Sequence, residues 1–391
     1  MTTLPRIAIY RDELLPLSET FILSQSGAYR RYEPWFIGSR RVPGLETPAH
    51  HTLVLGGESR RAQRSFRVAK LLGQPPLPSL NALRALQPAL LHAHFGHDAV
   101  YALPYANRLN LPFMVTFHGY DLTRHRSAEW LRSPAAAYRT AYSRWVERLY
   151  PAVFRSAGLV LAVSQHLADR LVARGCPPEK VRVHYIGVDE GEFPYRPDHP
   201  RQPIVLFIGR LVPKKGVDWL IRAMSIVQAA RPDVKLVIGG FGPLRPELES
   251  LAARSLHNVS FLGSLDHSQV KQWIVQAAVL CVPSVEAALG EPEGIPITVM
   301  EAQATGTPVV ASNYAGLKEV IQDGVTGLAA SQNDVAALAA ALLRALEDQP
   351  LRATFVAAAR RQVETRFSLT ANTRALESLY DEVIAAHSLP R

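Results

Sequence analysis

The stretch that decides the fold is Glu291–Ala311, with the sequence EPEGIPITVMEAQATGTPVVA. We expect a loop, a helix, a turn and a strand to follow one another along it. Pro296 suits the first helical position, where a missing N–H costs nothing, and Gly306 suits the left-handed residue just past the helix end. Val309–Ala311 is short and apolar, as expected of a buried strand. The stretch therefore predicts one helix–strand step of an α/β fold.

Two carboxylates frame this unit. Glu293 precedes the predicted helix, and Glu301 lies eight residues further on, inside it. Because a helix N-terminus presents free N–H groups and the positive end of a dipole, it favours anions. The stretch is either a binding site at a helix start or a capping loop with two solvated glutamates, and both interpretations stay open here. Glu291 lies outside the spaced pair and has no assigned role.

Length and composition describe a globular protein. The 391 residues suffice for two domains with sizeable cores, and 48% hydrophobic with 20% charged residues is an ordinary composition. The apolar run Val335–Leu346 is interrupted by Arg344 and is too short to span a membrane. The N-terminus lacks the apolar stretch of a signal peptide. Two cysteines make no disulfide framework or metal cluster, so a cytoplasmic, reduced protein is expected.

The net charge of +9 is concentrated in the first half of the chain. Residues 1–200 hold 25 Lys and Arg against 16 Asp and Glu, whereas residues 201–391 hold 18 of each. An excess confined to one half predicts an anionic partner for that half, which could be nucleic acid, anionic lipid or a phosphorylated substrate.

Strands and helices alternate through both halves. Predicted strands cover residues 6–10, 90–95, 113–117, 159–163, 181–185, 204–208, 234–238, 259–262, 279–282 and 309–311. Predicted helices cover residues 21–32, 98–109, 165–174, 217–230, 247–255, 268–277, 296–305, a long segment from 335, and 367–386. This alternation predicts an α/β fold with two Rossmann-like, doubly wound parallel-sheet domains facing a central cleft.

The domain boundary is predicted at the segment Tyr195–Pro203, which holds three prolines in nine residues and has no periodicity. The predicted domains cover residues 1–196 and 197–366. The last predicted helix, within residues 367–391, is long enough to reach back to the first domain.

Two glycine-containing turns follow strands of the second half. In Gly209–Gly216 (GRLVPKKG), Gly209 allows close approach of the backbone to a ligand, Arg210 can fork onto phosphate oxygens, and Lys215 adds a point charge. A basic surface turn is the alternative, and the spacing matches neither a P-loop nor the dinucleotide fingerprint. Gly239–Leu244 (GGFGPL) is weak evidence by itself, because a tight turn explains it equally well.

The loops after parallel strands share one edge of a sheet. Arg210, Lys215, Gly242, Glu293 and the helix start at Pro296 are therefore expected to converge. Basic residues and a helix N-terminus hold a diphosphate, and Glu301 can accept hydrogen bonds from both ribose hydroxyls, as an acidic residue does in dinucleotide sites. We predict a nucleotide-diphosphate pocket with room for a sugar.

Histidines gather in the first half. His118 follows a predicted strand, where it has either a structural or a catalytic role. His92, His94 and His97 lie close in sequence, but no acidic residue stands beside them at metal-ligand spacing, so no metal is predicted there.

These motifs resemble retaining glycosyltransferase family 4, of the GT-B fold, over nearly the whole chain. The similarity is carried by Gly209–Gly216, Gly239–Leu244, the glutamates Glu293 and Glu301 with Gly306–Ala311, and in the first half by His118–Asp121 and Gly187–Phe193. Ser18–Phe21 (SETF) and Glu293–Pro296 (EGIP) resemble a bacterial subgroup that makes colanic acid and exopolysaccharide. The glycine-rich first loop common in the family is replaced here by Leu15–Thr20.

The resemblance implies roles for individual residues. Arg210 and Lys215 would bind the donor diphosphate, and Glu301 would hold the ribose. Glu293 would contact the donor sugar as a catalytic residue, and His118 would lie near the reacting carbon from the opposite domain. The remaining implied donor-site residues are Gly209, Gly242, Gly294, Ile295 and Pro296, and the implied acceptor-side residues are Ser18, Glu19, Thr20 and Asp121. No cofactor or metal is expected beyond the nucleotide-sugar co-substrate, and the chain has no Asp-X-Asp motif.

Basic and aromatic residues in the first half suggest a second partner. Arg60–Lys70 is rich in arginine, and Arg124–Tyr150 combines arginines with tryptophans and tyrosines. Cationic and aromatic residues at helical spacing suit an anionic membrane surface. We expect peripheral docking on the inner leaflet and a lipid-linked saccharide acceptor in surface polysaccharide synthesis. A solvated basic face with buried aromatics is the alternative.

Other functions remain open at this point. The chain could be another GT-B enzyme, such as a phosphorylase, a nucleotide-sugar epimerase or a soluble small-molecule glycosyltransferase. The charge alone would also suit a nucleic-acid-binding protein, but no helix-turn-helix, zinc or RNA-platform signature accompanies it.

Overall fold

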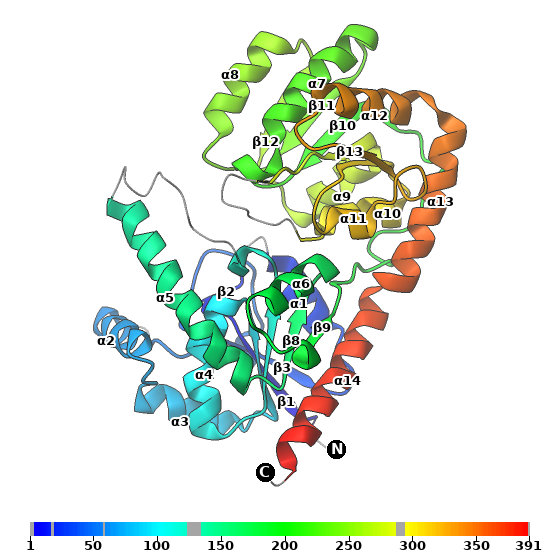
Figure 1. Ribbon diagram of the computed structural model, residues 1–391. Helices are drawn as coiled ribbons and strands as arrows, with labels where there is room; N and C mark the ends of the chain where they lie inside the picture. Colours follow the sequence, from blue (N-terminus) through cyan, green and yellow to red (C-terminus); the bar gives the residue numbers. More distant parts are fainter. Residues whose placement is uncertain (1–3, 17–18, 58, 123–133, 287–293, 390–391) are drawn as a thin grey trace. The chain divides into compact units, whose positions relative to one another are not determined.

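The computed structural model describes residues 4–16, 19–57, 59–122, 134–286 and 294–389 (Figure 1). The chain divides into two compact units. The first unit comprises Met1–Gly187 and Leu369–Arg391, and the second comprises Val188–Ser368.

The first unit is built on a seven-stranded sheet with the order β5-β3-β1-β6-β7-β8-β9, in which every pair is parallel. Its strands are β1 (Arg6–Tyr10), β3 (Glu33–Gly38), β5 (Thr52–Val54), β6 (Leu90–His94), β7 (Phe113–Phe117), β8 (Leu159–Ala162) and β9 (Val181–Val183). A separate small sheet pairs β2 (Glu13–Leu14) with β4 (Arg40–Arg41). The strand order reverses between β1 and β6, and open α/β sheets bind ligands at the carboxyl ends of the strands beside such a switch.

Helices of the first unit follow its strands in turn. They are α1 (Thr20–Gly27), α2 (Arg60–Leu71), α3 (Leu77–Leu86), α4 (Gly96–Leu109), α5 (Pro134–Ser156), α6 (Gln165–Ala173) and α14 (Leu369–Ser388), with 3₁₀ turns η2 (Ala49–His51), η3 (Tyr120–Leu122) and η5 (Pro178–Lys180). The strands β6 and β7 are buried along their whole length, as expected of a parallel sheet covered on both faces.

The C-terminal helix α14 completes the first unit. The hydroxyl oxygens of Tyr29 and Tyr380 lie 2.7 Å apart. The backbone N–H groups of Arg30 and Arg31, just past the end of α1, both donate to Glu377 at 2.7 Å. Because these contacts are buried or partly buried, α14 is a structural part of the first unit.

The second unit has a six-stranded sheet with the order β12-β11-β10-β13-β14-β15, again with every pair parallel. Its strands are β10 (Gln202–Ile208), β11 (Lys235–Gly239), β12 (Val259–Gly263), β13 (Ala277–Val282), β14 (Val309–Ser312) and β15 (Leu328–Ala330). Its helices are α7 (Val217–Ala230), α8 (Arg245–Ser255), α9 (His267–Gln276), α10 (Ile297–Thr305), α11 (Leu317–Val320), α12 (Val335–Glu347) and α13 (Gln349–Arg366), with the 3₁₀ turn η6 (Pro213–Lys215). The switch point lies between β10 and β13.

The predicted α/β class with two doubly wound parallel sheets is confirmed. The helix–strand step at its centre is α10 followed by β14. Gly306 ends α10 with φ +79°, as predicted. Pro296 lies one position before the predicted one, at the N-cap with ψ 132°, because its extended backbone starts the helix only at Ile297.

Two boundaries differ from the predicted ones. The predicted domain boundary after residue 196 lies inside the second unit, which begins at Val188. The segment between them belongs to the second unit because Arg196 donates its backbone N–H to Thr305 at 3.0 Å. The helix predicted over residues 21–32 ends at Gly27, and the chain then enters β3, for which no strand was predicted.

No helix in the described part of the chain is both long enough and apolar enough to span a bilayer.

Candidate functional site

The loops after β10 and β11 are joined at the carboxyl edge of the second sheet. The backbone N–H of Gly209 donates to the carbonyl of Gly239 at 3.0 Å, and that of Leu211 donates to Phe241 at 2.8 Å. Gly240 has φ +139°, and a Cβ at this position would lie 1.8 Å from the carbonyl oxygen of Gly209. Only glycine permits this contact, so this glycine is explained by loop packing alone.

The loop after β10 is also joined to the segment that leads into α10. Gly216 has φ +63°, and a Cβ there would lie 2.0 Å from the carbonyl oxygen of Pro283. The N–H of Val285 donates to the carbonyl of Lys214 at 2.9 Å. Three connecting segments, after β10, β11 and β13, therefore form one continuous surface. Gly242 lies in it as well, and its carbonyl accepts from Arg245 at the start of α8 (3.2 Å).

Two of the predicted cationic residues lie in this surface. Arg210 is exposed and makes no ion pair among the residues that the structure describes. Lys215 is half-buried, and its Cε lies 3.8 Å from the position that a Cβ of Gly209 would take. The structure thus brings Arg210 and Lys215 to the same edge as Gly209 and Gly242, as an anion site requires.

The start of α10 faces the same edge because it follows β13. Ile295 is buried, and Gly294 and Pro296 are half-buried. The N–H of Val299 donates to the carbonyl of Pro296 at 3.0 Å, and the preceding N–H groups of the first turn have no acceptor within the helix. Glu293, the predicted catalytic glutamate, and Glu291 lie outside the described residues.

Glu301 is a buried carboxylate on α10, only 6% exposed. Among the described residues it accepts no hydrogen bond and forms no ion pair. Burial raises its pKa from 4.5 to about 7 because desolvation disfavours the charged form. A ligand that supplies hydrogen-bond donors would stabilise the charged form of such a buried carboxylate.

His118 follows β7 at the carboxyl edge of the first sheet. Its Nε2 lies 3.1 Å from Nδ1 of His94, and the two rings are stacked with centroids 5.3 Å apart. Phe21 and Phe95 contact the same imidazole, with ring centroids at 4.8 and 4.5 Å. Burial, assisted by neighbouring positive charge, holds the pKa of His118 well below its usual range, so the ring is neutral near pH 7.

The His94 contact leaves one ring nitrogen of His118 unsatisfied. Nδ1 is buried and has no hydrogen-bond partner among the described residues. In a neutral imidazole one nitrogen donates and the other accepts, so Nδ1 offers one unmet hydrogen bond in either tautomer. A sugar hydroxyl could meet that bond as donor or acceptor.

Asp121 holds the loop that carries His118. Its carboxylate accepts from the backbone N–H groups of Gly96 (2.8 Å), Gly119 (2.9 Å) and His118 (3.2 Å). The Tyr150 hydroxyl donates to the carbonyl of Asp121 at 2.6 Å. Burial raises the pKa of Asp121, and the backbone hydrogen bonds oppose that shift. The acceptor-side role of Asp121 stays a prediction, and the geometry adds a positioning role.

The predicted acceptor-side loop contains a buried ion cluster. Arg11 holds both carboxylate oxygens of Glu19, at 2.7 and 2.8 Å, and its third nitrogen contacts Asp98. Burial outweighs this pairing and raises the pKa of Glu19. Thr20 is the first residue of α1, and Ser18 lies outside the described residues. Glu19 therefore anchors the start of α1 to the end of β1.

His92 and His94 are buried next to each other on β6. His92 contacts the Tyr380 hydroxyl through Nδ1 (2.8 Å) and Thr116 Oγ1 through Nε2 (2.7 Å). Burial holds the pKa of both His92 and His94 well below the usual range. Within the described residues no three His, Cys, Asp or Glu side chains gather as metal ligands.

The sequence interpretation missed Arg11, Asp98 and Phe95. Arg11 directly follows the first strand of its sheet, much as Arg210 follows β10 by two residues in the other sheet, and this position in the sequence was an available signal. Asp98 lies in the first turn of α4, where an acidic residue is favoured by the helix dipole. Phe95 has φ +71° at the end of β6 and contacts Arg11 with 4.7 Å between guanidinium and ring centroid. Nothing in the sequence predicts this strained backbone.

Two family descriptions match the chain in succession. "Glycosyltransferase Family 4" matches residues 28–192, and "Glycosyl transferases group 1" matches residues 192–362.

Relatives match over most of the chain. An amylovoran biosynthesis glycosyltransferase of Erwinia amylovora, AmsK, is 32% identical over 70% of this chain and 65% of its own length, so just under two thirds of AmsK is spanned. WcaL of Salmonella typhimurium, named as a glycosyltransferase of colanic acid biosynthesis, is 32% identical over 74% of this chain and 70% of its own length.

Solved structures share the fold at lower identity. HepE of Anabaena, in complex with UDP-glucose, has a TM-score of 0.75 at 20% identity and covers 96% of this chain and 99% of its own. Sucrose-phosphate synthase of Thermosynechococcus elongatus has a TM-score of 0.76 at 22% identity and covers 98% of this chain and 100% of its own.

Proposed function

Because this chain belongs to the group 1 glycosyltransferases, we propose that it transfers a sugar, with retention, from a UDP- or GDP-linked donor to a lipid-linked or oligosaccharide acceptor. The predicted family and the GT-B fold are confirmed. Glycosyl transfer follows from the family. The donor, the acceptor, the retaining course and the assigned residues are the proposal.

The observation that carries the donor assignment is Glu301. It is a buried carboxylate without a partner among the described residues, and burial raises its pKa to about 7. The two adjacent hydroxyls of a ribose supply the two hydrogen bonds that such a group lacks. A nucleotide whose ribose lies on α10 brings its diphosphate to the loop after β10.

Positive charge at that loop supports the diphosphate assignment. Arg210 and Lys215 lie on the same edge as the start of α10, whose N–H groups and dipole add to their field. Negative charge grows on the diphosphate as the bond to the sugar breaks, and cations fixed beside it stabilise the transition state more than the ground state. In a retaining transfer the new bond forms on the face that the diphosphate leaves, so these cations also lie beside the incoming hydroxyl.

His118 and Glu293 are proposed as the groups that contact the reacting sugar. His118 is neutral with an unmet hydrogen bond at Nδ1, which suits a sugar hydroxyl better than a charged group. Asp121 positions the loop that carries it. Ser18, Glu19 and Thr20 are proposed on the acceptor side, where the pair of Glu19 with Arg11 would hold the loop in place. No metal or other cofactor is proposed.

A role in bacterial surface polysaccharide synthesis is proposed from the relatives. AmsK and WcaL carry names that refer to amylovoran and colanic acid, and HepE was solved with UDP-glucose. These are properties of those proteins, and they set the first donors and acceptors to test.

The test is a thermal-shift screen of UDP- and GDP-sugars followed by NMR of the early product. A donor that binds the folded state raises the melting temperature by mass action. We expect stabilisation by at least one nucleotide sugar and a product with the donor's anomeric configuration. Inversion would contradict the retaining mechanism. Release of free sugar without an acceptor would favour an epimerase, and stabilisation by nucleic acid alone would favour the binding-protein alternative.

Membrane docking of the first unit is proposed from the end of α2 and the turn into α3. Val68, Leu71, Leu72 and Leu77 are exposed within ten residues, and Leu72 is 69% exposed. Arg64 and Arg67 are exposed on the same helix. Apolar side chains beside cations suit the headgroup boundary of an anionic bilayer.

Charge supports the same surface, whereas Tyr142, Trp145 and Tyr150 of α5 do not. The first unit holds 26 Lys and Arg against 15 Asp and Glu, a net charge of +11. Tyr150 is buried, and Tyr142 and Trp145 pack against the core beside Tyr101. These three aromatic side chains therefore pack in or against the core, whereas residues 123–133 and the side chains of residues 134–140 lie outside what the structure describes. Docking on anionic lipid through α2, with a cytoplasmic and peripheral location, is the remaining proposal.

We expect Leu72→Ser with Leu77→Ser to weaken binding to vesicles of phosphatidylcholine with phosphatidylglycerol by about tenfold or more, because each leucine loses its burial in lipid. Sedimentation measures the bound fraction. Ile226→Ser, at an exposed position of α7 in the second unit, is the matched control. A bound fraction that does not depend on lipid charge or salt concentration, or that is unchanged by the double substitution, would contradict the proposal.

A further inference from the structure

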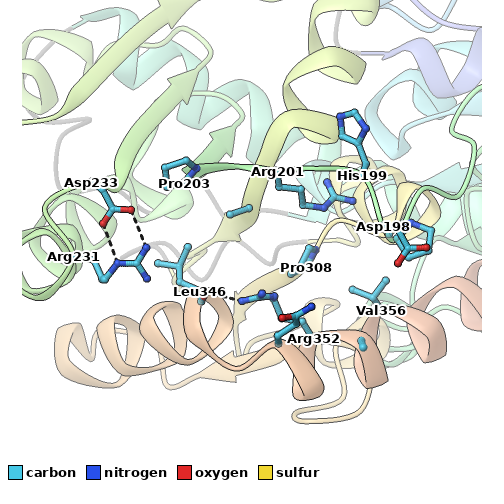
Figure 2. A pocket seen from close by; sticks show the side chains of 15 residues that line it. Asp198, His199, Arg201, Pro203, Arg231, Asp233, Pro308, Leu346, Arg352 and Val356 are labelled. Atoms are coloured by element: carbon cyan, nitrogen blue, oxygen red, sulfur yellow. Dashed lines mark hydrogen bonds and ion pairs between the residues drawn. The ribbon is translucent and has the colours of Figure 1, made fainter.

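A pocket lies at the edge of the second sheet where the strands begin, opposite the edge that carries Arg210 and Lys215. Its volume is about 660 Å³ (Figure 2). Pro203 at the start of β10, Ala278 near the start of β13 and Pro308 just before β14 line it. Arg352 on α13 lines it as well, and Figure 2 shows it on the helical wall, with Arg201 on the wall formed by the segment before β10. The donor-side loops leave the carboxyl ends of these strands, so the two sites lie at opposite edges of one sheet.

Arg201 donates to the protein through both terminal nitrogens, and its Nε has no hydrogen-bond partner among the described residues. Its Nη1 donates to the carbonyl of Val275 at 2.8 Å and to Thr307 Oγ1 at 2.7 Å. Its Nη2 donates to the carbonyls of Arg196 and Thr305 at the longer distances of 3.4 and 3.5 Å. No carboxylate among the described residues pairs with it, and burial lowers its pKa to about 10. An anion would relieve this cost of desolvation.

Arg352 donates through Nη1 alone and so has more unused donors than Arg201. Its Nη1 donates to the carbonyls of Ala345 and Leu346 in the last turn of α12, at 3.0 and 2.5 Å. Neither Nε nor Nη2 has a hydrogen-bond partner among the described residues, and no carboxylate there pairs with this arginine. Each guanidinium carries five N–H donors, so the helix-capping contacts leave donors unused on both arginines.

The other charges of the pocket define what can bind. Arg231 and Asp233 neutralise each other through two hydrogen bonds of 2.8 and 2.9 Å. Asp198 lines the pocket without an ion pair among the described residues, and His199 lies beside it. Arg201 and Arg352 have no ion-pair partner, whereas Asp198 is the one unpaired carboxylate that lines the pocket among the described residues. The pocket is therefore positively charged overall, and Asp198 can accept hydrogen bonds from the hydroxyls of a ligand.

We propose that this pocket binds a small phosphorylated sugar or polyol. Its phosphate would accept from the unused Nε and Nη2 of Arg352, which form one edge of that guanidinium, and from the unused Nε of Arg201. Its hydroxyls would donate to Asp198. A volume of about 660 Å³ accommodates a ligand of this size. The pocket is a site beyond the donor site, and it stands whether or not the donor assignment holds.

A purely structural role for the arginines is the competing explanation. Arg201 contacts the last turn of α9, and Arg352 contacts the last turn of α12, where cations favour the helix dipole. That role accounts for Nη1 and Nη2 of Arg201 and for Nη1 of Arg352. It leaves unexplained why two arginines line one concave site while no carboxylate among the described residues pairs with either of them.

The test is calorimetry with glucose 6-phosphate, using glucose and inorganic phosphate as matched probes. We expect glucose 6-phosphate to bind the full-length protein more tightly than either probe. Arg352→Gln should weaken it about tenfold or more, the loss expected for a charge-assisted hydrogen bond. Arg254→Gln, at an exposed position of α8, should leave it unchanged.

Arg210→Ala separates this pocket from the donor site. We expect it to retain binding of glucose 6-phosphate, whereas Arg352→Gln should retain binding of the nucleotide sugar. Arg201→Lys, which keeps the charge and loses the fork, provides a second variant if Arg352→Gln unfolds. No binding to the folded wild type, or binding that is lost in Arg210→Ala or undiminished in Arg352→Gln, would overturn the proposal.

Discussion

Glu301→Gln is expected to abolish donor binding and, at the same time, to stabilise the unliganded protein above pH 7. The folded-state pKa of Glu301 is about 7, against an ordinary value of 4.5. The folded state therefore holds the proton longer than the unfolded chain does, and stability is lost as the pH rises from 4.5 to 7. Glutamine has the same shape and never ionises, so the variant escapes this loss.

Urea denaturation at pH 5 and pH 8 measures the effect. We expect a gain in the free energy of unfolding of about 3 kcal/mol at pH 8 and below about 1 kcal/mol at pH 5. Glu247→Gln, at an exposed position of α8, is the control and should change neither stability nor donor binding. Stability that is equal to the wild type at pH 8, or calorimetric donor affinity that is unchanged, would remove Glu301 from the site.

Arg210→Ala is expected to lower kcat for glycosyl transfer by about 10²–10³-fold, the typical cost of removing a group that stabilises transition-state charge. The effect should fall more on kcat than on KM, because charge on the diphosphate grows as the glycosidic bond breaks. Steady-state kinetics with the donor identified by the screen measures it. Arg210 is exposed, so the melting temperature should hardly change.

Two further variants test this interpretation. Arg210→Lys keeps the positive charge but lacks the paired N–H donors of a guanidinium group, so its kcat should lie between those of Arg210→Ala and the wild type. Arg254→Ala removes an exposed arginine from α8 and should leave both kcat and KM unchanged. A loss confined to KM, or an equal loss in Arg254→Ala, would contradict a role at the leaving group.

Much of the fold could be predicted from local patterns. The bounds of α7 and β7 match the predicted ones, because both elements are continuous, strongly patterned and bounded by turn residues. Gly306 could be predicted as a helix end because a left-handed residue is needed there. In contrast, β3 was missed because Tyr29 and Tyr32 extend an apolar helical pattern beyond Gly27. Their burial against Tyr380, far away in the chain, decides the structure instead.

The position of candidate-site residues on one sheet edge could be predicted only where a suitable residue type directly follows a strand. Arg210 and Lys215 satisfy that condition, and the structure places them on one edge with Gly242 and α10. The partners of Glu19 and Asp121 are set by contacts between distant segments, Arg11 and Gly96 among them. The burial that raises the pKa of Glu301 and the unmatched charge of Arg201 depend on packing in three dimensions, which no local pattern encodes.

We propose that Glu301 binds the donor as a carboxylate, and such binding must release a proton wherever the free side chain is protonated. Calorimetry at pH 7 in two buffers of different ionisation enthalpy gives the number of protons released. With a pKa of about 7 in the free protein, we expect about half a proton per nucleotide sugar at pH 7 and almost none at pH 8.5. Affinity should rise over the same interval. Binding without proton release at pH 7, or with the same release in Glu301→Gln, would show that Glu301 does not bind the donor as a carboxylate.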